Sequence, residues 1–325
     1  MTMQDFQPFP TDALGHVDPA LRNAAREIWA LMTRDDVNLS MLRAGRSVPD
    51  RQWRDDVPVS RKLIPGAPGD PDIPIHIINA RPGLSCPGIL HMHGGGFVTG
   101  AAHHDVAMLQ DMARSLDAVI VSVDYRLAPE VRYIGSVEDN YCGLAWMHAH
   151  TDELGVDRAR IAIAGESAGG GHAALLAIAA RGRGEYPILF QSLVYPMLDD
   201  RTGSSRAVPP HVGTLIWTPQ CNRLGWEALL GEPPGTDSVL RAGVPARTAD
   251  LAGLPPAWIG VGAVDLFVDE DIDYARRLID AAVPTELLVV PGAFHGFDLL
   301  VPDSPPARQL QQARLNALRR AFIPA

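Results

Sequence analysis

Residues 160–180 read RIAIAGESAGGGHAALLAIAA, and this stretch decides the fold. The apolar run Arg160–Ala164 is typical of a strand that is covered on both faces, and the small residues that follow predict a helix packed closely on it. Between them lies Gly165-Glu166-Ser167-Ala168-Gly169, a G-x-S-x-G motif, which needs a sharp strand-to-helix turn that exposes the serine hydroxyl. Glycines at both ends avoid clashes in such a turn. We therefore predict Ser167 as a nucleophile at a helix amino terminus, where the helix dipole favours an anion.

The rest of the chain repeats this rhythm of short apolar runs and amphipathic stretches, as βαβ units do. Nearly continuous apolar runs predict buried strands at Gly88–His93, Val119–Tyr125, Arg160–Ala164, Ile188–Tyr195, Ala257–Val261 and Glu286–Val290. The earlier segment Ile73–Ile77 alternates in polarity, which predicts an antiparallel strand near the edge of the sheet. The expected class is α/β, with a mostly parallel central sheet and helices on both faces.

Composition limits the classes of function. The 325 residues are enough for one large domain, and 46 % apolar with 20 % charged residues is ordinary for a soluble enzyme. A net charge of −10 disfavours nucleic acid and anionic membrane surfaces as partners. The amino terminus has no basic region followed by an apolar stretch, and no apolar run reaches the roughly 20 residues that span a bilayer, so a cytoplasmic location is expected.

Two regions depart from the βαβ rhythm. Residues 1–50 contain a predicted helix, Pro19–Met32, with Leu21, Ala24, Ile28 and Leu31 on one face, and its place before the first strand suggests a cap. Residues 200–250 are irregular, rich in Pro and Gly, and contain Trp217 and Trp226. This insert follows a strand, where α/β folds place loops that face a ligand.

A glycine-rich loop, His93-Gly94-Gly95-Gly96-Phe97, directly follows the strand Gly88–His93. A tetrahedral intermediate needs backbone N–H donors aimed at its oxygen, and glycine lets the backbone approach closely. We predict an oxyanion hole from the N–H groups of Gly94, Gly95 and Gly96 together with that of Ala168, the residue after the nucleophile.

His295 and Asp265 are the predicted partners of Ser167. His295 lies just after the last strand and Asp265 after the preceding one, so the chain order is Ser, Asp, His, as this fold requires. His295 is expected to act as the base and Asp265 to hold the imidazole tautomer. The competing carboxylates Asp269, Glu270 and Asp271 begin the next helix and are interpreted as charges at its amino terminus.

Other polar clusters are interpreted as structural. His91 and His93, with His103 and His104 shortly after, could bind zinc, but no acidic or cysteine partner is near them in sequence, so no metal is expected. Cys86, Cys142 and Cys221 are too far apart for a zinc site or a disulfide framework. Arg126 is expected to pair with a carboxylate such as Glu130, and Asp199 and Asp200 are expected to brace loops.

Five of these stretches resemble the hormone-sensitive-lipase-like branch of α/β hydrolases, the bacterial esterases with an HGGG motif. They are His93–Phe97, Val123–Glu130, Gly165–Gly170, Gly262–Glu270 and Phe294–Phe297, in family order over about residues 88–300. The resemblance implies one α/β-hydrolase domain over 1–325, with a helical cap formed by about 1–50 and an insert at about 200–235. It also implies hydrolysis of short- to medium-chain acyl esters without a cofactor, and in many members a homodimer. Two departures leave the subfamily open: Glu166 stands where many members have Asp or Thr, and the segment after Glu130 lacks the usual Pro and Phe.

The expected reaction is acyl transfer from a small ester through an acyl-enzyme on Ser167. Two alternatives stay open, a hydrolase or acyltransferase that uses the same triad on an amide or lactone, and a non-catalytic small-molecule receptor. Nearness to the motifs suggests walls for the substrate pocket at Phe97, Val98, Met197, Leu198, Ile216, Trp217, Phe267 and Phe297, although each could equally be core packing.

Overall fold

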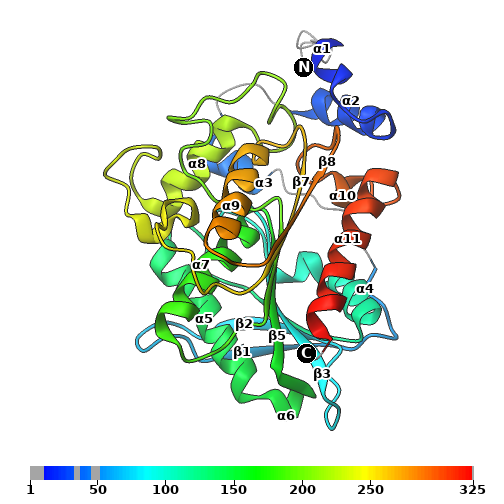
Figure 1. Ribbon diagram of the computed structural model, residues 1–325, viewed down its shortest axis with the longest axis vertical. Coiled ribbons are helices and arrows are strands. Elements are labelled where there is room, and N and C mark those ends of the chain that lie inside the picture. The colour runs from blue at the N-terminus through cyan, green and yellow to red at the C-terminus, as the bar shows by residue number, and fades with distance from the viewer. Residues whose placement is uncertain (1–10, 33–36, 45–51, 324–325) are drawn as a thin grey trace.

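A single mixed sheet organises the protein. The computed structural model describes residues 11–32, 37–44 and 52–323, and within them eight strands pair in the order β1-β2-β4-β3-β5-β6-β7-β8 (Figure 1). The strands are β1 (Val59–Ile64), β2 (Ile73–Ile78), β3 (Cys86–Met92), β4 (Val119–Val123), β5 (Val156–Glu166), β6 (Phe190–Val194), β7 (Ala257–Gly262) and β8 (Thr285–Val290). β2 is antiparallel to both of its neighbours, and every pair from β4 to β8 is parallel. The predicted α/β class with a mostly parallel sheet is confirmed.

All seven predicted strands are present, with bounds that shift by a few residues, and β2 is antiparallel as expected. β1 was not predicted. Arg61, Lys62 and Leu63 are exposed on this edge strand, so its sequence shows neither an apolar run nor a clean alternation. Charged side chains on an edge strand also discourage pairing with another chain.

Helices cover both faces of the sheet, as predicted. α5 (Tyr133–Ala149), α7 (Ala168–Arg183) and α9 (Val268–Asp280) pack on one face, and α4 (Val106–Leu116) and α11 (Pro305–Phe322) pack on the other. The remaining helical segments are α1 (Thr11–Gly15), η1 (Pro19–Leu21), α2 (Arg22–Leu31), α3 (Leu39–Ala44), η2 (Ala102–Asp105), α6 (Thr151–Leu154), α8 (Pro219–Leu230), η3 (Arg241–Gly243), η4 (Pro245–Arg247) and α10 (Phe297–Leu300). No helix in the described ranges combines the length and the apolar character needed to cross a membrane.

The amino-terminal helix differs from its prediction in one respect. It begins as the 3₁₀ turn η1 and continues as α2. Leu21 and Ala25, which are four residues apart, are buried, whereas Leu31 at the end of α2 is 83 % exposed and is not part of the buried face.

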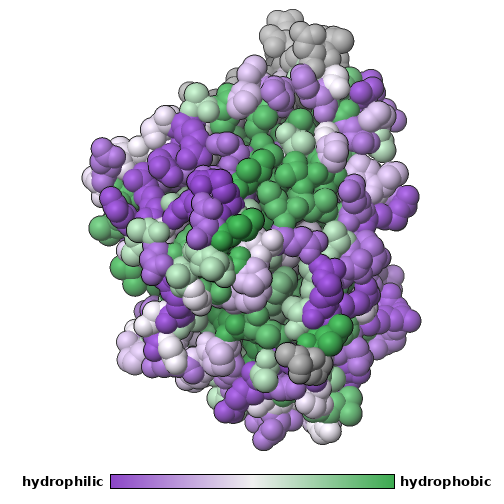
Figure 2. All heavy atoms as spheres, viewed as in Figure 1, coloured by the Kyte–Doolittle hydropathy of each residue, from purple (hydrophilic) through white to green (hydrophobic). Residues whose placement is uncertain are grey.

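The segments outside the βαβ rhythm gather at one end of the sheet. α2 and α3 lie with α8 toward the carboxyl ends of the parallel strands, in the upper part of Figure 1. At the opposite edge from β1, Figure 2 shows apolar side chains gathered over β8, between α9 and α10, where Leu287, Leu288 and Val289 are half-buried. The carboxyl ends of the strands, where α/β sheets bind ligands, are the part of the sheet closest to the irregular segments.

Candidate active site

The predicted strand-to-helix turn carries Ser167 between β5 and α7. Ser167 has φ 57° and ψ −122°, a sparsely populated conformation for a residue with a side chain. Its N–H donates to the Val194 carbonyl at 2.9 Å, and its own carbonyl accepts from the Met197 N–H at 3.0 Å. These bonds tie the turn to the end of β6 and hold the strained residue in place.

The glycines of the motif are required by close backbone contacts. A Cβ atom at Gly165 would lie 2.3 Å from the Gly169 carbonyl oxygen, and one at Gly169 would lie 2.1 Å from the Met92 carbonyl oxygen. Neither position tolerates a side chain, so the turn presses directly on the end of β3, from which the glycine-rich loop leaves.

The structure brings Ser167, His295 and Asp265 together from three different strand ends. With the Nδ1–H tautomer that the geometry favours, the Ser167 hydroxyl donates to His295 Nε2 at 3.0 Å, and His295 Nδ1 donates to Asp265 Oδ2 at 2.9 Å. The other Asp265 oxygen accepts the Phe267 N–H at 3.0 Å. Ser167 and His295 are 7 % and 6 % exposed and both line the cavity, whereas Asp265 is fully buried, so this chain of hydrogen bonds is closed to solvent at its aspartate end.

Two aromatic rings fix the orientation of the imidazole. The Tyr195 and Phe267 rings lie 4.6 and 5.2 Å from the His295 ring, centre to centre. The Tyr195 hydroxyl donates to Asp298 Oδ1 at 2.8 Å, which connects the end of β6 to α10, the helix that follows His295. Sequence reasoning missed Tyr195 and Asp298; the available signal was a tyrosine at the carboxyl end of a parallel strand.

The predicted oxyanion glycines lie beside the serine. Gly94, Gly95 and Gly96 line the same cavity as Ser167, and a Cβ at Gly94 would be 3.5 Å from the Ser167 Cβ. Ala168 is buried as the first residue of α7, whose amino-terminal N–H groups need partners. The loop is supported from below, because the Tyr125 hydroxyl donates to the His93 carbonyl at 2.6 Å and the two rings stack at 4.2 Å.

A cavity of about 380 Å³ opens over Ser167 and His295. Of the predicted wall residues, Ile216 and Trp217 line it. The other six, Phe97, Val98, Met197, Leu198, Phe267 and Phe297, do not: they are at most 1 % exposed and pack in the hydrophobic core. Nearness in sequence to the motifs failed here because these side chains point back into the core, beneath the strand ends. The apolar residues that sequence reasoning missed are Met32, Met41, Leu42, Met108, Leu299 and Leu300. They come from segments distant in sequence, which no local pattern connects with Ser167.

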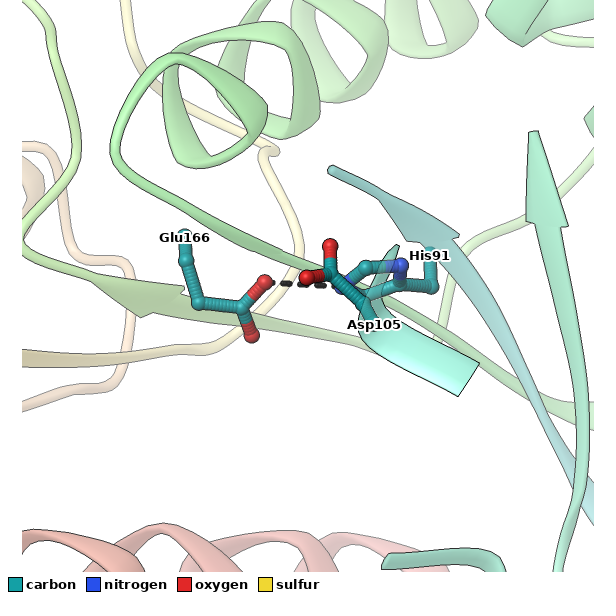
Figure 3. A group of neighbouring side chains, drawn as sticks. All are labelled: His91, Asp105 and Glu166. Atoms are coloured by element: carbon teal, nitrogen blue, oxygen red, sulfur yellow. Dashed lines mark hydrogen bonds and ion pairs between the residues drawn. The ribbon is translucent and has the colours of Figure 1, made fainter. Parts of the chain in front are cut away.

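Beneath the serine lies a buried ionic group, part of which is drawn in Figure 3. Glu166, at the end of β5, points toward His91 on β3, whose Nε2 donates to Oε2 at 2.7 Å. Arg314 of α11 lies 2.6 Å from the other Glu166 oxygen. Burial raises the pKa of Glu166, but Arg314 and His91 outweigh burial and lower that pKa to about 2. Glu166 is therefore a charged, paired residue directly before Ser167.

His91, Asp105 and Glu166 also offer three ligand atoms within 4.8 Å of one another, a spacing compatible with a metal ion (Figure 3). The pairing of these residues does not fit a resident ion. Arg314 already supplies the positive charge beside Glu166, and both His91 nitrogens have hydrogen-bond partners, Glu166 and Ser122. Sequence reasoning had considered only the histidines, because Asp105 and Glu166 meet His91 through the fold.

The acidic start of α9 is a correction to the sequence interpretation. Only Asp269 behaves as a surface charge, paired with Arg206 at 3.2 Å. Glu270 is buried and accepts the N–H groups of Leu198 and Asp199 at 2.7 and 3.1 Å, and burial raises its pKa well above the usual value. Asp271 is fully buried, and burial, Glu270 and Asp265 together raise its pKa.

Arg126 and Glu130, which were expected to pair with each other, have other partners. Arg126 binds Asp139 and Asp70 instead of Glu130, because Asp139 faces it from α5. Glu130 pairs with Arg43 of α3 at 2.6 Å, an exposed contact that ties the amino-terminal segment to the loop after β4.

The two aspartates after β6 hold the insert together. Asp200 pairs with Arg247 at 2.6 Å and accepts the Gly235 N–H at 2.6 Å. Asp199 pairs with Arg201 and Arg206 at 2.8 and 3.2 Å. These contacts match the bracing role expected from their sequence position.

Known proteins share this architecture over nearly the whole chain. A model of the α/β hydrolase fold matches residues 89–299. Esterase LipI of Mycobacterium tuberculosis is 33 % identical over 308 residues, covering 93 % of this chain and 94 % of that protein. Carboxylesterase NlhH of the same organism is 32 % identical over 322 residues, covering 96 % and 98 %. A solved structure described as a bacterial heroin esterase is 35 % identical with a TM-score of 0.86, covering 96 % and 99 %. The chain belongs to the α/β-hydrolase fold family, in the hormone-sensitive-lipase-like branch that its motifs resemble.

Proposed function

We propose that this protein is a serine carboxylesterase that hydrolyses short- to medium-chain acyl esters. The observation that carries the proposal is the hydrogen-bonded chain from Ser167 through His295 to Asp265, which ends in a cavity bordered by three consecutive glycines. Family membership and relatives named esterase and carboxylesterase support the same reaction.

In the first step, the Ser167 oxygen attacks the ester carbonyl while His295 Nε2 takes the hydroxyl proton. Asp265 keeps Nδ1 protonated and stabilises the imidazolium that forms. The carbonyl oxygen becomes an oxyanion that the N–H groups of the Gly94–Gly96 loop and of Ala168 are proposed to hold, each such donor being worth about 3–4 kcal/mol of barrier. His295 then gives the proton to the leaving alkoxide, and the acyl group stays on Ser167.

In the second step, water replaces the alcohol. His295 takes a proton from the water, the hydroxide attacks the acyl carbonyl, and the collapse of the second tetrahedral intermediate returns the proton to Ser167 and releases the acid. Ser167, His295, the ester and water supply every bond and proton exchanged in the two steps, so this reaction sequence needs no cofactor.

The cavity supports small substrates. A volume of about 380 Å³ lies at the low end of the range for small-molecule sites, and most of its lining side chains are apolar. We propose that α2, α3 and the insert at about 200–235 act as the cap of a single domain, since Met32, Met41 and Leu42 from the first and Ile216 and Trp217 from the second close the cavity. From the sequence we also propose a cytoplasmic location and a homodimer.

The decisive experiment measures hydrolysis of p-nitrophenyl esters from acetate to decanoate by wild type and by Ser167→Ala. We expect wild-type turnover with a maximum at short acyl chains and a loss of at least about 10³-fold in the variant. Ser238→Ala, at an exposed serine just after the insert, is the matched control and should retain wild-type rates. Absence of turnover on every ester would sink the proposal.

A second measurement separates catalysis from binding. A p-nitrophenyl dialkyl phosphate should add one dialkylphosphoryl group to the wild-type mass and none to Ser167→Ala, because the modification needs an activated serine. A receptor that binds esters without turning them over would fail both tests. Parallel assays with p-nitroanilides, lactones and added alcohols would identify an amidase, lactonase or acyltransferase using the same residues.

A further inference from the structure

The backbone is strained at Ile216, in the wall of the cavity. Ile216 has φ +63°, and among the non-glycine residues at positive φ in the described ranges it is the one with a β-branched side chain. The Trp217 N–H donates to the Leu215 carbonyl at 2.7 Å, which closes a three-residue γ-turn around Ile216. The positive-φ form of this turn is rare and strained, and a branched residue makes it more so.

The neighbours of Ile216 hold this conformation. Leu215 is 2 % exposed and packs in the core cluster of α4 and α11, whereas Trp217 is 7 % exposed and packs in the cluster around α8. The Trp217 indole N–H donates to Asn222 Oδ1 at 3.1 Å. Its ring also lies against Gly96, where a Cβ would come within 1.9 Å of it. Strain of this kind persists only where the surrounding structure over-determines it.

The consequence of the turn is the position of the Ile216 side chain. It borders the cavity together with Ser167 and His295, while Met32, Met41 and Met108 form much of the remaining apolar lining. Methionine side chains adapt to different shapes, whereas isoleucine is stiff about χ1. Ile216 is thus a stiff side chain in a wall that also contains three adaptable methionines.

We propose that Ile216 is a specificity-determining residue, which the strained turn holds in the cavity so that it limits the bulk of one substrate group beside Ser167. This inference rests on the ester hydrolysis proposed above. It also explains why the strain is retained: glycine would relieve it but would leave no side chain in that part of the cavity.

The kinetic test uses Ile216→Ala and Ile216→Gly on two series of esters. One series varies the acyl group of p-nitrophenyl esters from acetate to 2-methylpropanoate and 2,2-dimethylpropanoate, and the other varies the alcohol of acetates from methyl to tert-butyl. Only the series that varies the group beside Ile216 should respond. In that series, kcat/KM for the most branched ester should rise about 10- to 100-fold relative to kcat/KM for the smallest ester, which is the range associated with a methylene or two in an apolar pocket. The smallest member of each series is the reference, so the readout is the ratio of the two kcat/KM values in each variant.

The stability test does not depend on activity. Alanine removes the side chain and keeps the strain, whereas glycine removes both, so Ile216→Gly should melt at a higher temperature than Ile216→Ala. The usual order is the reverse, because glycine increases the entropy of the unfolded chain. Leu240 is the matched control: it is an exposed aliphatic residue of the same irregular region, outside the cavity lining and with φ −63°. Leu240→Gly should melt below Leu240→Ala, and neither should change selectivity.

Two kinetic results would overturn the inference while leaving the esterase proposal intact. One is wild-type turnover with unchanged selectivity in both Ile216 variants. The other is an equal loss on small and bulky esters, which would mean that Ile216 acts on the glycine loop through Trp217 and not on substrate size. Absence of wild-type turnover would instead remove the proposed function itself.

Discussion

Buried carboxylates lie on both sides of the proposed triad, one beside Ser167 and two beside Asp265, and their environments are opposite. On the serine side, Glu166 lies between His91 and Arg314, which together lower its pKa to about 2 in spite of burial. On the aspartate side, Glu270 and Asp271 have no such cation among their closest contacts in the described residues, and burial raises the pKa of both. All three carboxylates are buried, so the compensating cation decides in which direction each pKa is shifted.

The two sides of the site are therefore connected to the rest of the fold by different interactions. Glu166 connects β5 to β3 and α11 through its contacts with His91 and Arg314. The residue that follows it, Ser167, has strained backbone angles. Glu270 connects α9 to the loop after β6 by accepting two backbone N–H groups. Breaking the first connection leaves a buried charge without its cation, whereas altering the second group changes a carboxyl whose pKa burial has raised. The predictions below test this contrast.

Asp265 lies between the two groups and should show the largest effect. Asp265→Asn leaves the shape intact but cannot keep the Nδ1–H tautomer of His295, so we expect kcat on p-nitrophenyl acetate to fall about 10⁴-fold. Asp269→Asn, at an exposed position on α9, serves as the control. A decrease below tenfold would mean that another acid, such as Asp271, supports His295 in place of Asp265. An ionised Asp271 would also remove the contrast between the serine side and the aspartate side.

Arg314→Met should have the next largest effect, on stability. It leaves Glu166 buried without its cation, and the free energy of unfolding should fall by about 3–5 kcal/mol in urea titrations at pH 7. The double variant Glu166→Gln, Arg314→Met carries no buried charge and should recover part of that loss. Equal losses in the single and double variants would assign the effect to the packing of the arginine stem, or to its 3.1 Å bond to Ser192, and not to charge.

The convergence of the three proposed reacting groups is easier to predict from the sequence than the groups that surround them. Ser167, His295 and Asp265 each follow a recognisable strand, and parallel strand ends meet at one edge, so their convergence follows from topology. Arg314 could not be predicted, because it reaches Glu166 from a helix 148 residues later (314 − 166), and only the packing of α11 brings the two together. The wall residues failed for a related reason: Phe97 and Met197 adjoin the motifs in sequence but point into the core. The turn at Ile216 has no local signal, since branched residues normally avoid it.

Asp271 gives the smallest and most specific prediction. Because its pKa in the folded protein is raised above the unfolded value, its carboxyl contributes full stability below the unfolded pKa of about 3.9, and this contribution is lost as the pH rises toward the folded pKa. Asp271→Asn removes the titration, so the variant should gain stability over wild type by up to ~1.4 kcal/mol for each pH unit in that window and show little difference near pH 4. Urea unfolding from pH 4 to 8.5 measures this difference, with Asp269→Asn as the exposed control. A constant difference across the range would mean that Asp271 is ionised and stabilised like Glu166, in which case burial without a cation does not distinguish the aspartate side from the serine side.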